Sequence, residues 1–120
     1  MALILTMAAG ALWAHHSPSA EFDMHQKLSV SGTLTKVDWI NPHIMFYLMD
    51  AKGAEWRLES NPPAWFRRVG VARADFTPSL GQMVTMEGVP AKDGSHFGYI
   101  NKMTLPDGRT LELTNAAEGK

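Results

Sequence analysis

The chain is divided into short runs in which apolar and polar residues alternate, and this pattern constrains its fold more than any other feature. A period of two places successive side chains on opposite faces of a strand. Residues that favour turns stand between the runs, such as Asn41-Pro42 and the segment Pro106-Asp107-Gly108-Arg109. The runs cover residues 28–39, 43–49, 54–59, 82–89, 96–105 and 110–113. In 120 residues they predict one small all-β domain.

The first two runs depart from simple alternation of apolar and polar residues. Apolar residues occupy one phase up to Leu34, and the phase then shifts to Val37 and Trp39. This shift, with Gly32 inside the run, predicts one long strand that bulges or coils between two packing surfaces. The second run is apolar at almost every position, which predicts a strand buried on both faces.

Between the third and fourth strands the sequence predicts a short helix. Ser60 and Asn61 can cap it, and Pro62-Pro63 suits its first turn. Its apolar stripe would comprise Trp65, Phe66 and Val69, with Gly70 closing the helix. This order predicts a small OB-like β-barrel of five or six strands, with one short helix between strands 3 and 4. A β-sandwich is the alternative, although the strand count is low for one.

Residues 1–14 read differently from the rest, because 12 of the 14 are apolar. The run is shorter than the roughly 20 residues that span a bilayer. It is typical of a secretory signal peptide, although no Lys or Arg precedes Lys27. Cleavage after Ala14 would expose His15, and a cut after Ala11 is the alternative. A buried N-terminal helix is disfavoured because the run has no polar face.

We therefore expect four segments: a signal peptide at 1–14, a polar N-terminal segment at 15–26, the barrel at 27–113 and a frayed tail at 114–120. The expected location is the periplasm or another site outside the cytoplasm. After processing, no integral membrane segment is expected.

Charge and cysteine content exclude several functions. The formal net charge of −1 shows no excess of positive charge that would bind the phosphates of a nucleic acid. The absence of Cys excludes disulfides, a thiolate nucleophile and cysteine metal ligands. Any bound metal would rest on nitrogen, oxygen or thioether ligands.

Three motifs suggest a family. They are the paired His15-His16 after the expected signal, the segment LSVSGTLTKVDWINPH ending at His43, and LGQMVTMEGVPAKDGS followed by LPDGRTLEL. With these motifs the chain resembles domain-of-unknown-function family 6152, a group of small exported bacterial proteins, over roughly His15 to Leu113. The resemblance implies a β-barrel of the cell envelope and implies no reaction.

The histidines are the main candidates for a site. His15 would offer both its α-amine and an imidazole, and His16 adds a second imidazole, a donor set that suits Cu(II). His43 follows the turn formed by Asn41 and Pro42, which Trp39 precedes, and three imidazoles would also suit zinc. His25 and His96 are secondary candidates, since no spacing ties them to the others. The alternative is that these histidines are solvent-exposed or only hydrogen-bond a neighbouring strand.

The six methionines that follow the expected signal peptide form a second candidate set, which includes Met45, Met49, Met83 and Met86. Thioethers ligate Cu(I), but methionine is also a common core residue. Because these methionines fall within alternating strand patterns, core packing is the preferred interpretation.

Two other functions are less well supported. Base stacking could use Trp39, Trp56, Trp65, Tyr47 and Phe97, with Arg57, Arg67 and Arg68 for phosphates. Balanced charge and predicted inward positions argue against nucleic acid as a partner. For hydrolysis, Ser17 lies beside His16, and Asp23 or Asp38 could assist, but no nucleophile motif supports a triad. Glu55 and Glu59 flank Arg57 and are interpreted as solvated charge.

The sequence thus favours an exported OB-like binding protein for copper, zinc or a small ligand, rather than a conventional enzyme. The alternative is a structural or protein-interaction module of the envelope that holds no metal.

Overall fold

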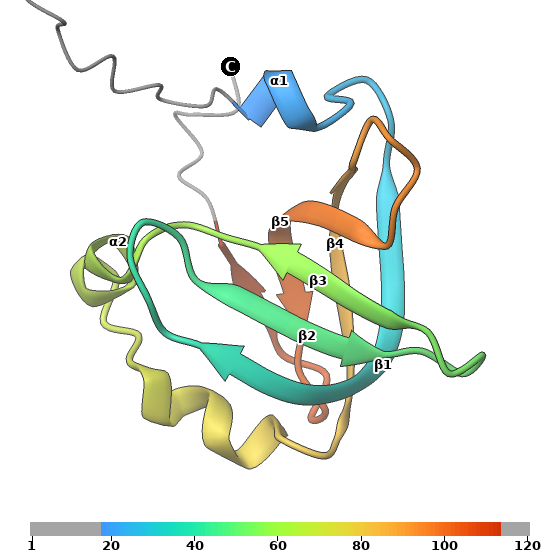
Figure 1. The fold of residues 1–120 in the computed structure, drawn as a ribbon. Coiled ribbons are helices and arrows are strands. Elements are labelled where there is room, and N and C mark those ends of the chain that lie inside the picture. Colours follow the sequence, from blue (N-terminus) through green and yellow to red (C-terminus); the bar gives the residue numbers. More distant parts are fainter. Residues whose placement is uncertain (1–17, 114–120) are drawn as a thin grey trace, which may run out of the picture.

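The computed structural model describes residues 18–113, and Figure 1 shows them as a curved sheet with short helices around it. The elements in chain order are helix α1 (Pro18–Glu21), strands β1 (Leu28–Asp38), β2 (Met45–Met49) and β3 (Glu55–Glu59), helix α2 (Pro63–Arg68), the 3-10 helix η1 (Arg73–Ser79), and strands β4 (Met83–Pro90), β5 (Phe97–Thr104) and β6 (Thr110–Glu112).

The strands form a closed barrel. They pair in the order β3-β2-β1-β4-β5-β6, and a parallel pairing of β3 with β5 closes the ring. Five strands make the barrel, and β6 extends β5 outside it. The expected OB-like barrel, with its helix between strands 3 and 4, is confirmed, and the β-sandwich alternative is wrong.

The long first strand bends as its phase shift predicts. Its first half pairs with β4, and its second half pairs with β2. The register on β2 slips between Leu34 and Lys36, so Thr35 is the extra residue of a bulge. Gly32 has a different role, because a Cβ there would lie 2.5 Å from the carbonyl oxygen of Met49. Glycine allows β1 and β2 to approach closely where β1 changes partners.

Strand β2 differs from its prediction. Its residues alternate between buried and more accessible positions, with Phe46 and Leu48 fully buried and Met49 exposed. The prediction of a strand buried on both faces is wrong, because a closed barrel packs only the inner face of each strand.

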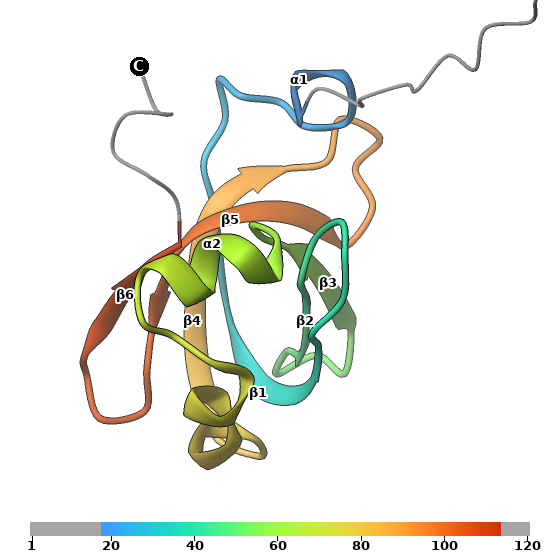
Figure 2. The ribbon, with the colours of Figure 1, turned by 90° about the vertical axis from the view of Figure 1, so that its left-hand side faces the viewer.

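Helix α2 lies across one end of the barrel (Figure 2). Pro62 is its N-cap and no side chain caps it, so the predicted capping by Ser60 and Asn61 is wrong. Both residues are buried and extend the pairing of β3 with the start of β2, through hydrogen bonds to Ile44. Trp65 and Phe66 enter the core as predicted, but Val69 is 50% exposed.

The core fills the barrel and the space under the helices. Phe76 from η1 contacts Phe46 edge-on with ring centroids 5.1 Å apart, and it also lies against Phe66. The other fully buried large side chains inside the barrel are Leu34, Ile44, Leu48, Leu58, Met86, Ile100 and Met103.

The segment before β1 is attached to the outside of the barrel. Phe22 is 1% exposed and pairs with Ala91, and its ring lies 5.0 Å from that of Phe97. Hydrogen bonds from Asp23 to Pro90 and from Lys92 to Glu21 fasten the same region. The interpretation of residues 15–26 as a polar segment did not predict this attachment.

The expected signal peptide and frayed tail lie outside the described residues. Across residues 18–113, no helix has both the length and the apolar character needed to cross a bilayer.

Candidate functional site

His43 lies at the rim of the barrel, between the Asn41-Pro42 turn and the start of β2. The Asn41-Pro42 peptide bond is cis, and Trp39 packs against Phe66 with ring centroids 5.3 Å apart. The side chain of His43 is 35% exposed. The turn therefore presents the imidazole to solvent from a backbone that the core holds in place.

A hydrogen bond to the backbone orients the imidazole. The Nδ1 atom of His43 lies 2.7 Å from the carbonyl oxygen of Ser60. A carbonyl oxygen only accepts hydrogen bonds, so Nδ1 carries the proton and donates it. In the neutral ring, Nε2 is then left with a free lone pair. Histidines that ligate metals are commonly fixed in this way, by donating the other ring N–H to a carbonyl or carboxylate.

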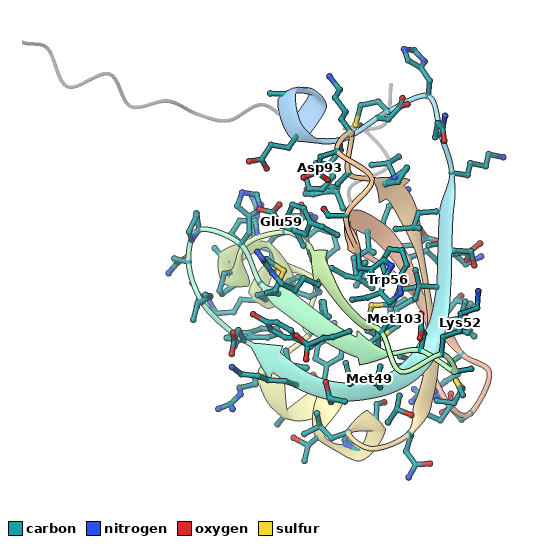
Figure 3. The ribbon with its side chains drawn as sticks, turned by 45° about the vertical axis from the view of Figure 1, so that its right-hand side comes forward. Met49, Lys52, Trp56, Glu59, Asp93 and Met103 are labelled. Atoms are coloured by element: carbon teal, nitrogen blue, oxygen red, sulfur yellow. The ribbon has the colours of Figure 1, made fainter. Side chains whose placement is uncertain are left out.

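Glu59 lies beside this histidine, on the side of the barrel that faces α1 (Figure 3). Its Oε1 is 3.8 Å from the Nδ1 of His43, and its side chain is only 18% exposed. Burial raises the pKa of Glu59, and Glu21 raises it further, while His43 and Arg57 act in the opposite direction. The interpretation of Glu59 as solvated charge is wrong, because neighbouring elements cover it.

Tyr99 and Asn61 complete the surroundings of His43. The Tyr99 hydroxyl donates to Oδ1 of Asn61 at 2.9 Å, and Nδ2 of Asn61 donates to the carbonyl of Leu113. The Tyr99 ring meets the His43 ring edge-on with centroids 6.4 Å apart. The strand register pairs Met45 with Glu59 and Glu59 with Tyr99, which places these side chains in one row on the outer face. We call His43, Glu59, Asn61 and Tyr99 the rim cluster.

The N-terminal segment packs against the rim cluster. The ring of Phe22 lies 5.6 Å from that of Tyr99, so one aromatic ring separates Phe22 from His43. Glu21 of α1 also acts on Glu59, in the direction that raises the pKa of its carboxyl group. His15 and His16 lie outside the described residues, two to three positions before Pro18 where α1 begins.

The secondary histidines lie elsewhere. His25 is exposed, and its backbone N–H donates to Asp23. His96 stacks on Trp56 with centroids 4.6 Å apart. Among residues 18–113, no three His, Asp or Glu side chains are grouped closely enough to hold a metal. A metal bound at His43 would therefore need ligands from beyond the described part of the chain.

The methionines divide into two groups. Met86 is fully buried, as expected for core packing, whereas Met45 is half-buried on the outer face beside Glu59. Met49 is 36% exposed and Met83 60% exposed, so core packing is wrong for these two. Both pair with Thr33 from opposite sides and thus share the outer face of the barrel.

The aromatic residues give little support for base stacking. Trp65 is buried, and Trp39 and Trp56 pack against the core. Only Tyr47 and Phe97 of the five candidates lie on the outer face, and each already has a cation over its ring, from Lys36 and Arg57 respectively.

The candidate catalytic carboxylates have structural partners. Asp38 accepts a hydrogen bond from Tyr47 and pairs with Lys36, and Asp23 accepts the backbone N–H of His25. Ser17 and His16 lie outside the described residues.

Comparison with known proteins identifies the family. The model of a family of unknown function, DUF6152, matches residues 3–101 of the chain. The chain belongs to this family. A search of curated proteins finds no match.

Proposed function

We propose that this protein is an exported OB-like binding protein that holds copper or zinc through His15, His16 and His43. The observation that carries the proposal is the hydrogen bond from Nδ1 of His43 to the Ser60 carbonyl at 2.7 Å. It fixes the tautomer in which Nε2 is the free donor atom, on a ring that is partly open to solvent.

The attachment of the N-terminal segment supports the contribution of His15 and His16. Phe22 and α1 pack beside the rim cluster, and His16 precedes Pro18 by two residues. Each residue spans at most about 3.6 Å, so the reach of this short connection is limited. With cleavage after Ala14, the α-amine of His15 and two imidazoles would start from this side of the barrel.

The carboxylate of Glu59 supports binding of a cation. It lies 3.8 Å from the ring nitrogen that faces away from the free donor atom, in a half-covered position. An ionised carboxylate there would stabilise a cation held by the opposite nitrogen of the ring, as outer carboxylates do in many metal sites. Imidazole and amine ligands suit Cu(II) and Zn(II).

The test is a calorimetric titration of Cu(II) and of Zn(II) into protein that begins at His15, in a buffer with a weak competing chelator. The expected result is about one equivalent of bound metal. His43→Ala should weaken binding at least about tenfold, because a direct ligand is lost. His25→Ala is the matched control, an exposed histidine outside the rim cluster, and it should bind like the parent protein.

Unchanged binding after replacement of both His15 and His43, or the absence of binding, would contradict the proposal. In that case the alternative, a protein-interaction module of the envelope, would be preferred. Retention of the same envelope partners by a variant that lacks all three histidines would support that alternative.

A further inference from the structure

We propose a second binding site, independent of the metal site, in the groove between β1 and η1, and we infer that it takes a small amphipathic carboxylate. The groove has a volume of about 640 Å³, which lies within the range of small-molecule pockets. In Figure 1 it corresponds to the region where η1, in yellow, runs beside the curved part of β1.

The β1 bulge forms one wall of this groove. The slip in register makes Thr35 the extra residue and leaves both Thr35 and Lys36 exposed, where regular alternation would turn one of them inward. The Thr35 hydroxyl donates to the Tyr47 carbonyl at 3.2 Å, so its lone pairs remain available to a ligand. Bulges commonly re-aim side chains in this way beside binding sites.

The floor and the opposite wall are mainly apolar. Val37 and Phe76 are buried and line the base of the groove. Leu80, which is 43% exposed, lies at its edge beyond η1. An apolar chain placed here would cover surface that no described residue covers, which favours its binding by the hydrophobic effect.

The charges of the groove select an anion. Lys36 pairs with Asp38 at 3.3 Å, an exposed pair that contributes little by itself. Arg73 also lines the groove, and within residues 18–113 it makes no ion pair. Asp75, its neighbour on η1, turns to the backbone N–H of Ala72 and does not line the groove. One positive charge is therefore left over at the rim of an apolar trough.

A carboxylate with a short apolar chain matches this arrangement. The guanidinium of Arg73 would take the carboxylate through two parallel hydrogen bonds, the geometry that arginine favours. The chain would lie on Val37 and Phe76 and end near Leu80. Because the groove is open to solvent along one side, it suits a small amphiphile better than a cofactor that must be fully enclosed.

The experiment follows backbone amide NMR signals while sodium octanoate is added below its micellar concentration. Saturable shifts at Thr35, Ala74 and Thr77 are expected. Arg73→Gln should weaken octanoate binding about tenfold, the loss expected for a charge-assisted hydrogen bond. Arg109→Gln is the matched control, because Arg109 is an exposed arginine of the β5–β6 turn that does not line the groove. It should leave the affinity unchanged.

Octanol has the apolar chain but no carboxylate, and acetate has the carboxylate but no apolar chain. Both should bind more weakly than octanoate. Leu80→Glu, a change at an exposed position, provides a second variant that should also weaken binding. The absence of saturable shifts in the groove, equal affinity for octanol, or equal loss in Arg73→Gln and Arg109→Gln would overturn the proposal. None of these outcomes bears on metal binding by the histidines.

Discussion

Several polar side chains among residues 18–113 hold backbone segments in place through hydrogen bonds. Asp50 accepts hydrogen bonds from the backbone N–H groups of Lys52 and Ala54 and from the indole of Trp56, all within 3.0 Å. His43 is oriented by a backbone carbonyl, and Asn61 joins Tyr99 to Leu113, the residue after β6. Such contacts set the positions of rings and turns around the rim cluster.

Asp50 gives a prediction about pH. Hydrogen bonds, first that of Trp56, lower its pKa below the usual 3.8, so the folded state favours the ionised form. Its stabilising contribution is thus complete above the unfolded pKa and is lost as the pH falls through the lower, folded value. Asp50→Asn places an amide donor against the donors that Asp50 accepts, and it should lower the melting temperature at pH 7. The difference from the parent protein should shrink steadily below pH 3.8.

Thermal unfolding from pH 7 to pH 2 measures this difference. A gap between Asp50→Asn and the parent protein that stays constant over the whole range would contradict the assigned role of the ionised carboxylate.

Tyr99 gives a prediction about buried polar groups. Tyr99→Phe removes the donor to Oδ1 of Asn61, a side chain that is only 5% exposed. A buried acceptor without a partner costs about 1–3 kcal/mol, so the free energy of unfolding should fall by that amount. Chemical denaturation measures it. Tyr47→Phe is the control, because its acceptor Asp38 also pairs with Lys36 at the surface, and it should cost less.

Helix α1 and the residues between it and β1 connect the barrel to the part of the chain before Pro18. Helix α1 has four residues and is too short to be stable alone. Phe22 holds it, through contacts with Phe97 and Tyr99 and through pairing with Ala91. The same contacts bring the segment beside His43.

This link predicts a coupled effect of Phe22→Ala. The substitution should cost about 2–3 kcal/mol, somewhat below the roughly 3–5 kcal/mol of a Phe→Ala change in a core, because the segment can detach without opening the barrel. It should also weaken the proposed Cu(II) binding, since the segment that follows His15 and His16 would no longer be fastened beside the rim cluster. Calorimetry on the folded variant measures both quantities.

Val84→Ala is the control for loss of stability alone. Val84 is a buried residue of β4 that pairs with Gly32 of β1, away from the contacts of Phe22. Its substitution should lower the melting temperature and leave the copper affinity unchanged. Equal copper affinity in Phe22→Ala and the parent protein would contradict the proposed link between the N-terminal segment and the metal site.

The order of the elements along the chain, the bulged first strand and the turn before His43 could all be predicted, because each depends on local alternation or on turn residues. The burial of Glu59 could not, because the alternation within β3 places this residue on the outer face and does not show which other parts of the chain pack there. The hydrogen bond from His43 to the Ser60 carbonyl could not be predicted either, because every residue has a backbone carbonyl and the sequence does not show which one lies beside the ring. One signal was present: Phe22 is the only aromatic residue of the polar segment 15–26, and a lone aromatic there could have indicated an anchor.

At the scale of the whole molecule, closure of the barrel depends on close backbone approaches between strands. Gly88 lies at the register shift between β4 and β5, and a Cβ at this position would collide with the backbone of Tyr99 and Ile100. Closure also brings β3 beside β5, which places Glu59 next to Tyr99 and so assembles the rim cluster. The site is therefore a product of the closed topology rather than of any one strand.

Gly88→Ala should accordingly disrupt the pairing of β4 with β5. Backbone atoms cannot yield as a flexible side chain can, so we expect a loss of more than about 2 kcal/mol in the free energy of unfolding. Gly98→Ala is the comparison, because its closest contact is with the movable side chain of Leu28. It should cost less. Urea denaturation of both variants measures the difference, and equal losses would argue against the backbone collision.

The central claim is that Nε2 of His43 is the metal-binding atom while Nδ1 keeps its proton for the Ser60 carbonyl. Long-range ¹H–¹⁵N NMR of the imidazole rings, recorded on protein beginning at His15 with and without Zn(II), tests it most directly. The Nε2 resonance of His43 should shift on addition of one equivalent of Zn(II), while its Nδ1 remains protonated. Unchanged resonances of the His43 ring, or metal binding through Nδ1, would contradict it.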